Sequence, residues 1–276
     1  PLIVQYFYYI RNLLHFDLGT SIRTSRPVLD DLARCYPATL ELALFSIVIA
    51  SLFGILFGII SAIRRNSVID QAVRAVSVTG VSIPAFWFAL LMLYFFYYKL
   101  KIFPGPGRLS NSFSAPQTVT GMYVLDSLLE GNTAKAMDAL RHLILPSIVL
   151  AAFTMGLITR TTRSNLLDAL STDYIRTAKA KGVAKWKVIF KHALRNSLLP
   201  IITYAGPQIA YIITGSMVIE TIFTVGGIGS KFVSAITNRD YTMIMATTIF
   251  LATLMVVANL ICDLLYKLVD PRIKFD

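Results

Sequence analysis

Charged residues are scarce in this sequence, and their scarcity excludes a soluble globular protein. Only 15% of the 276 residues are charged, whereas 55% are hydrophobic. A soluble domain of this length has too little interior to bury so much apolar surface. The composition therefore predicts an integral membrane protein.

Cysteine and histidine are also scarce, which argues against a disulfide framework or a metal centre. The two cysteines, Cys35 and Cys262, lie far apart, and the second falls inside an apolar run. His15, His142 and His192 show no metal-ligand spacing to either cysteine. We expect no disulfide and no metal site.

No segment carries a recognisable catalytic motif. The run V-G-G-I-G-S-K at 225–231 superficially suggests a phosphate-binding loop, but it lacks the G-x-x-x-x-G-K-[ST] spacing. No Ser/His/Asp arrangement is evident either. We therefore expect a chain that is not an enzyme and that holds no cofactor of its own.

The net charge of +11 has two interpretations. In a soluble protein it would indicate binding to nucleic acid. Here most lysines and arginines lie in loops beside apolar runs, which is typical of membrane topology. We expect membrane lipid, and not nucleic acid, as a partner.

Five apolar runs are long enough to cross a membrane as helices, because roughly 20 helical residues span the hydrocarbon core. They cover residues 38–63, 83–98, 142–158, 198–223 and 244–265. The second and third runs are short, and Pro84 and Pro146 near their starts are tolerable at helix N-termini. The prediction is an all-α polytopic membrane protein.

Lysine and arginine set the expected orientation, since cytoplasmic loops are enriched in both. The loop 159–197 holds nine of them against two acidic residues, whereas the loop 224–243 holds only Lys231 and Arg239. The first loop and the C-terminus are therefore predicted to be cytoplasmic, and the second loop external. Alternation places residues 1–37 outside, so we expect one further span upstream and six in all.

The topology predicts two parts. Residues 1–37 form an external segment that follows the expected upstream span, and residues 38–276 form the transmembrane domain. That domain contains a long external loop at 99–141 and the basic cytoplasmic loop at 159–197.

The first span has a face of small residues at four-residue spacing. Such a face is a close helix-packing seam, either within the subunit or between subunits. Its members are Ser46, Ala50, Gly54, Gly58 and Ala62.

The fourth span has a polar face beside an expected kink at Gly206 and Pro207. Polar side chains at membrane depth line a water-filled path or make interhelical hydrogen bonds, and both interpretations fit here. The candidate path residues are Tyr204, Gln208, Tyr211 and Gly215.

Two carboxylates, Glu41 and Glu220, fall near the external ends of their spans. We expect Glu41 in the first turn of its helix, where the helix dipole favours an acid and a structural role follows. No acidic residue occupies the middle of any predicted span. The pattern therefore argues against a proton- or cation-coupled carrier.

The most informative segment is the basic stretch 173–200. We expect a short helix that begins after Thr172 as N-cap and ends at Gly182 in a left-handed cap, followed by a second helix. In the second helix an apolar face opposes a basic stripe, and such a helix can lie on a membrane surface. The apolar face is Trp186, Ile189, Phe190, Ala193 and Leu194, and the stripe is Lys187, Lys191 and Arg195.

This stretch resembles the EAA loop of inner-membrane subunits of binding-protein-dependent ABC importers, in the peptide and nickel permease group. Arg176, Thr177 and Ala178 stand at the nominal Glu-Ala-Ala positions, and Gly182 stands at the glycine position. Motifs along the whole chain are similar to the same group. They are F-D-L-G-T-S-I at 16–22, S-I-P-A-F-W at 82–87, V-I-E-T-I-F-T-V-G-G-I-G at 218–229, N-R-D-Y at 238–241 and D-L-L-Y-K-L-V-D-P-R-I at 263–273.

The resemblance implies the transmembrane domain of a type I ABC importer in a bacterial inner membrane. The expected partners are a second homologous permease subunit, two ATP-binding subunits that hold ATP and Mg²⁺, and a periplasmic or lipid-anchored substrate-binding protein. The residues expected to contact the ATP-binding subunits are Arg176, Thr177, Ala178, Lys179, Ala180, Lys181 and Gly182.

The long external loop is most like that of dipeptide and oligopeptide permeases, so the resemblance implies transport of di- or oligopeptides. Nickel, a metallophore, glutathione and opines remain alternatives. A secondary transporter is a rival, but it would need mid-span ionisable groups and, commonly, internal repeats. A membrane scaffold that transports nothing is the second rival.

Overall fold

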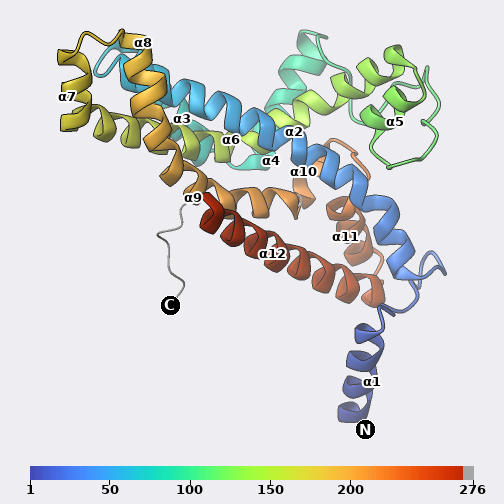
Figure 1. Cartoon of the computed structure of the whole chain (residues 1–276). Helices are drawn as coiled ribbons and strands as arrows, with labels where there is room; N and C mark the ends of the chain where they lie inside the picture. Colours follow the sequence, from blue (N-terminus) through green and yellow to red (C-terminus); the bar gives the residue numbers. More distant parts are fainter. Residues whose placement is uncertain (215, 270–276) are drawn as a thin grey trace. The chain divides into compact units, whose positions relative to one another are not determined.

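The computed structural model describes residues 1–214 and 216–269, with side chains placed for all of these except 195, 196, 198–205 and 265–269. Helices account for the regular structure of the described residues (Figure 1). Among the described residues, Thr20 and Pro27 form an isolated antiparallel β-bridge. The prediction of an all-α chain is confirmed.

The chain divides into two compact units, which we describe separately. Unit 1 contains residues 1–43, 89–146 and 213–255. Unit 2 contains residues 44–88 and 147–212 together with the described residues from 256 onward.

Three helices are long and apolar enough to cross a membrane: α2 (Val28–Ile63), α6 (Thr133–Ser171) and α12 (Tyr241–Val269). A fourth candidate is the pair formed by α3 (Val68–Ser82) and the segment Ala85–Lys99, which is bent by 112°. That segment consists of α4 (Ala85–Met92) and the π-helix η1 (Leu93–Lys99). The described helices support a multi-pass membrane protein.

Three helices, α2, α6 and α12, are longer than the apolar runs that predicted them. Pro37 lies inside α2 and Pro146 lies inside α6, so Pro146 is not at a helix N-terminus as expected. The expected fourth span, 198–223, is divided between α9 (Leu194–Ile213) and α10 (Met217–Ile222). Hydropathy marks the apolar part of a helix, and polar turns extend the helix beyond that part.

The core of unit 1 joins its N-terminal segment to α11 (Ile228–Thr237) and to the start of α12. α1 (Leu2–Leu14) and α5 (Tyr123–Leu129) also belong to this unit. The buried members of the core are Leu18, Val28, Leu32, Ile228, Ala235, Met243 and Ala246. The Ser21 hydroxyl adds a buried hydrogen bond of 2.5 Å to Asp240.

In unit 2 the small-residue face of α2 packs against α6. A Cβ added at Gly54 would lie 2.8 Å from Ile158 Cγ2, and one at Gly58 would lie 2.5 Å from Thr162 Cβ. Ala50 is buried in a cluster with Ile158. The close approach of the two backbones therefore explains the small residues as packing within the subunit.

Candidate functional site

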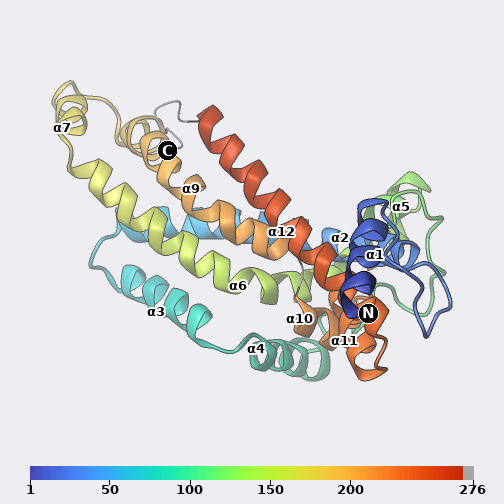
Figure 2. The same ribbon diagram turned by 90° about the horizontal axis from the view of Figure 1, so that it is seen from below.

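The basic segment forms two helices with a break between them, as predicted. After α6 ends at Ser171, α7 runs over Asp173–Ala180. The chain then enters α8 (Lys185–Lys187) and the π-helix η2 (Val188–Ala193), which continues into α9. Figure 2 shows α7 directly after the end of α6. The short helix is thus presented at the end of a long one.

Thr172 occupies the N-cap position of α7, but its side chain does not cap the helix. The hydroxyl instead donates a hydrogen bond of 2.6 Å to the Ala169 carbonyl in the last turn of α6. Thr172 is thus the N-cap residue, as predicted, but its hydroxyl bonds to the end of α6 and not to an amide of α7. The Thr172 carbonyl still accepts from the Arg176 amide.

Gly182 ends α7 with the left-handed geometry that the sequence predicts. Its φ is +71°, a region that L side chains rarely adopt. The Val183 amide donates to the Ala178 carbonyl at 3.2 Å, and the Gly182 amide donates to the Lys179 carbonyl at 3.0 Å. These two bonds define a Schellman motif, which satisfies carbonyls that the helix end would leave unpaired.

Ile175 anchors α7 to the rest of unit 2. Its side chain is fully buried, and it packs in a cluster with Ile59 of α2, Leu166 of α6, and Val188 and Ala193 of η2. Ala178 and Val183 lie against the same cluster. One face of α7 is therefore fixed to the helices of its own unit.

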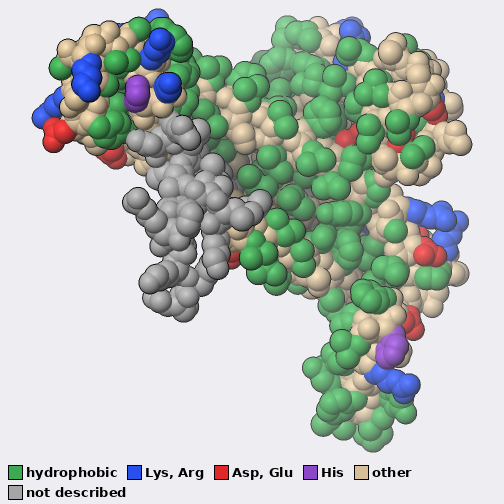
Figure 3. Space-filling view, in the orientation of Figure 1, with side chains coloured by type: hydrophobic (Ala, Val, Ile, Leu, Met, Phe, Trp, Pro, Cys, Tyr) green, Lys and Arg blue, Asp and Glu red, His purple; other side chains and the backbone are tan. Residues whose placement is uncertain are grey.

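The opposite face of α7 is open. Of the seven residues predicted to contact a partner, Ala178 is half-buried and the other six are exposed: Arg176, Thr177, Lys179, Ala180, Lys181 and Gly182. Lys and Arg side chains gather on the surface of the α7–α8 segment (Figure 3). The structure thus brings the predicted residues together on one small, basic surface.

The second helix departs from the predicted pattern. Ile189 and Ala193 are buried and Leu194 is half-buried, but Trp186 is 62% exposed and Phe190 is 51% exposed. Val188, which the pattern did not include, is buried. The reason is the π-helix η2, whose i→i+5 hydrogen bonds change the register that an α-helical spacing assumes.

A buried ion pair supports α6 before it reaches the basic segment, and sequence reasoning missed it. Asp70 is fully buried and accepts hydrogen bonds from Arg163, from the Ser61 hydroxyl and from the Asn66 amide. Ser67 caps α3 by accepting from the Asp70 amide. The spacing Ser67-x-x-Asp70 signals that cap, but no local pattern signals Arg163.

The candidate path residues lie on or after α9. The Gln208 side chain is half-buried and Tyr211 is exposed. The Tyr204 side chain and Gly215 lie outside the described residues. The role of these four residues in a translocation path stays a prediction.

Glu41 has a structural role, but not for the predicted reason. Since α2 begins at Val28, Glu41 lies well beyond its first turn. Its carboxylate accepts from Arg108 at 2.8 Å and from the amides of Tyr123 and Val124 at the start of α5. Glu41 therefore caps α5, in the loop 99–141, and not its own helix.

Glu220 caps α11 in the same manner. The buried carboxylate accepts from the Thr39 hydroxyl and from the Ser230 amide, and the Ile228 amide donates to Thr39 Oγ1. A Cβ at Gly227 would clash with both Thr39 and Glu220. The glycine-rich run is therefore a helix start whose Ile228 and Ser230 amides are already bound.

The cysteines Cys35 and Cys262 are free thiols. Across residues 1–214 and 216–269 no group of three His, Cys, Asp or Glu side chains is arranged to hold a metal ion.

Comparison with known proteins gives one consistent family. Residues 54–275 match the family described as "Binding-protein-dependent transport system inner membrane component". The chain is 45% identical, over 99% of its length, to a protein of Escherichia coli K12 named "Probable D,D-dipeptide transport system permease protein". It is 40% identical to the di/tripeptide permease of Pseudomonas aeruginosa and 41% identical to the dipeptide permease of Bacillus subtilis, again over 99% of this chain. The matches cover 80%, 81% and 80% of the three relatives.

Proposed function

Because this chain belongs to the family of inner membrane components of binding-protein-dependent transport systems, we propose that it is one permease subunit of an ATP-driven importer of di- and oligopeptides. The observation that carries the proposal is the α7 segment. This segment has one face buried on its own unit and one exposed basic face, in a chain similar over nearly its full length to dipeptide permeases. The same similarity favours peptides over nickel, metallophores, glutathione and opines.

The proposed complex has four membrane-associated subunits and a separate substrate-binding protein. A second homologous permease subunit completes the path, and two ATP-binding subunits hydrolyse ATP with Mg²⁺. A periplasmic or lipid-anchored binding protein delivers the peptide. In this arrangement the α7–α8 segment and the C-terminus face the cytoplasm, as the loop charges indicate.

The geometry supports a mechanical role for α7. A force applied to the exposed residues between Arg176 and Gly182 acts on a helix that Ile175 fixes to α2 and α6. Packed cores transmit displacement because they do not deform continuously. Closure of the ATP-binding subunits would therefore move α7 together with α2 and α6, and that rigid-body movement would alternate access to the path.

The test is uptake in proteoliposomes that contain the whole complex and its binding protein. We expect accumulation of a labelled dipeptide that requires internal ATP and continues when the proton and sodium gradients are dissipated. Uptake driven by an ion gradient without ATP would overturn the proposal in favour of a secondary transporter. Calorimetry of the binding protein with dipeptide, nickel and glutathione then identifies the substrate class.

A further inference from the structure

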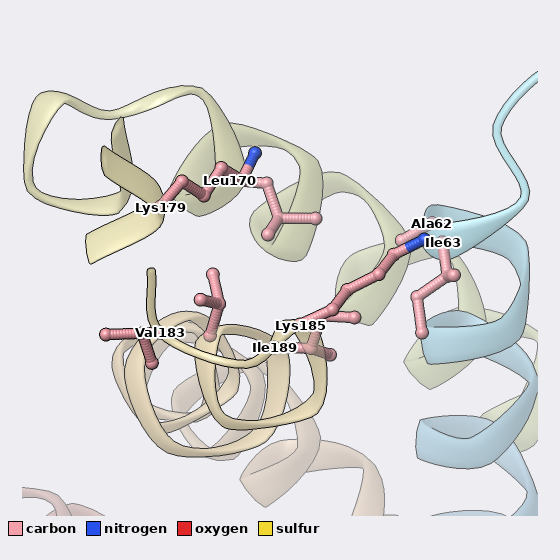
Figure 4. Close-up of a pocket in the computed structure, with 8 residues that line it drawn as sticks. Ala62, Ile63, Leu170, Lys179, Val183, Lys185 and Ile189 are labelled. Atoms are coloured by element: carbon pink, nitrogen blue, oxygen red, sulfur yellow. The ribbon is translucent and has the colours of Figure 1, made fainter. Parts of the chain in front are cut away.

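A pocket lies beneath the basic segment, at the cytoplasmic end of α2 in the proposed orientation. Its volume is about 360 Å³ (Figure 4). The end of α2, the end of α6, the break after α7 and the start of η2 all contribute walls. The lining residues are Ala62, Ile63, Leu170, Lys179, Val183, Lys185, Val188 and Ile189.

Two lysines are the polar side chains in this lining. In Figure 4 the Lys185 side chain extends toward Ala62 and Ile63, and Lys179 runs beside Leu170. Among the side chains that the structure places, no carboxylate lies within ion-pair distance of either ammonium group. The pocket therefore offers two uncompensated positive charges at the edge of an apolar surface.

The apolar part of the lining points to a ligand with a hydrocarbon portion. Ala62 and Ile63 form the last turn of a membrane-crossing helix, and Val188 and Ile189 are buried residues beside it. A lysine can hold a phosphate as a point charge while its own carbon stem rests on apolar neighbours. Basic pockets between helices on the cytoplasmic side of a membrane bind lipid head groups in this way.

We propose that this pocket binds an anionic phospholipid of the cytoplasmic leaflet. The phosphate would lie between the ammonium groups of Lys179 and Lys185, and the glycerol and upper acyl chain would lie on Ile63 and Ile189. This inference rests on the cytoplasmic orientation in the proposed function. A bound lipid would fill the space between α7 and the end of α2, and would so stiffen the connection between them.

The lipid is favoured over two other occupants of similar charge. A free phosphate ion would use the lysines but leave the apolar wall exposed to water. An acidic segment of an ATP-binding subunit would meet the exposed residues Arg176, Thr177 and Lys181 of the α7 segment, whereas Lys179 lies one helical turn after Ile175, on the side of the pocket. Both alternatives are separate outcomes of the experiment below.

The experiment uses the complete transporter in nanodiscs of equal parts phosphatidylcholine and phosphatidylglycerol, with retained lipid counted by native mass spectrometry after detergent exchange. The variant is Lys179→Gln with Lys185→Gln. The matched control is Lys181→Gln with Lys187→Gln, which removes the same charge from the same segment outside the pocket. A lysine beside anionic lipid contributes about fivefold in affinity, so the double variant should retain phosphatidylglycerol roughly twentyfold to thirtyfold more weakly.

Selective loss of phosphatidylglycerol in the pocket variant, with the control like the wild type, supports the site. Equal retention in both variants overturns it. Displacement of the lipid by millimolar glycerol phosphate would assign the pocket to a free phosphate. Loss of the ATP-binding subunits from the pocket variant with its lipid retained would assign the pocket to those subunits. If the wild-type complex retains no phosphatidylglycerol but still shows ATP-driven uptake, the lipid site is wrong and the proposed function stands.

Discussion

Arg163 forms a bidentate ion pair with the buried Asp70 carboxylate. Nε donates to Oδ1 and Nη2 donates to Oδ2, each at 2.8 Å. The pair joins the start of α3 to α6 about two turns before α6 ends. A bidentate pair of this kind fixes orientation as well as distance, so it holds the helix that carries the α7 segment.

We expect Arg163→Gln to destabilise unit 2, because it removes two hydrogen bonds to the buried Asp70 carboxylate and leaves the more distant Arg74, at 3.6 Å, as the counter-ion. Removing one partner of a buried pair costs about 3 kcal/mol. The same substitution at the exposed Arg160, three residues earlier on α6, should cost less than about 0.5 kcal/mol. The melting temperatures of the two purified variants check this difference. Equal melting temperatures would show that the pair contributes nothing.

Substitutions at Gly182 should show the cost of backbone strain without a steric clash. Its φ is +71° and nothing lies within 4 Å of an added Cβ, so Gly182→Ala costs about 1–2 kcal/mol of strain and no clash. Gly182→Asn should cost less, since Asn tolerates this region. Gly182→Pro excludes the left-handed turn and removes the amide that donates to Lys179.

The measurement for this series is dipeptide uptake and ATPase co-purification at equal membrane abundance. We expect activity in the order Gly, Asn, Ala, Pro, with the proline variant uncoupled or disassembled. Normal uptake and normal ATPase stimulation by Gly182→Pro would refute the assignment of the segment to the ATP-binding subunits.

Two adjacent glycines, Gly226 and Gly227, allow backbone strain to be compared with a steric clash. Gly226 has a φ of +72° and open space around it, whereas Gly227 has an ordinary φ but lies against Thr39 and Glu220. We expect Gly226→Ala to cost about 1–2 kcal/mol. Gly227→Ala should cost about 3 kcal/mol or more, because the new methyl group displaces the carboxylate that caps α11. Thermal unfolding of both variants checks the order, and a larger loss for Gly226→Ala would contradict it.

The sequence predicts local features of this chain well and distant pairings poorly. Gly182 was predictable because a left-handed helix end depends on one residue and its immediate neighbours. The exposure of Trp186 and Phe190 was not, because the π-helix η2 shifts the helical register and nothing in the apolar pattern signals it.

No local sequence pattern predicts that Glu41 caps α5 or that Glu220 caps α11. Glu41 is more than 80 residues from Val124, and Thr39 is more than 180 residues from Ile228. Glu41 was expected to be structural, but the partners of both carboxylates depend on how separate helices meet.

Glu41→Gln tests whether an acid within the apolar helix α2 serves structure or ion coupling. The carboxylate accepts three hydrogen bonds, including one from Arg108, and hydrogen bonds to charged groups contribute about 1.5–3 kcal/mol. We expect a lower melting temperature and lower membrane abundance, with unchanged uptake per molecule. The matched carboxylate-to-amide change at the exposed Asp168, Asp168→Asn, is the control and should change little. A change in the dependence of uptake on the proton gradient would contradict the structural role.

Acid should loosen the contact between the N-terminal segment and the start of α12, because Asp240 links them. Burial by itself would raise the pKa of Asp240, but hydrogen bonds from the Ser21 hydroxyl and from the amides of Met243, Arg23 and Ile22 lower the pKa below its ordinary value. Since the folded pKa is depressed, the stabilisation is complete above the ordinary value of about 3.9 and is lost as pH falls through the folded value.

Ser21→Ala removes one of these bonds, so the folded pKa rises and the loss should begin at a higher pH than in the wild type. Hydrogen exchange of residues 20–28 and 238–246, corrected for the intrinsic rate at each pH, measures the opening. Thr24→Ala is the matched control, because its hydroxyl donates to Asp31 and not to Asp240. If Ser21→Ala and the wild type opened at the same pH, Asp240 would not be the group whose protonation releases this contact.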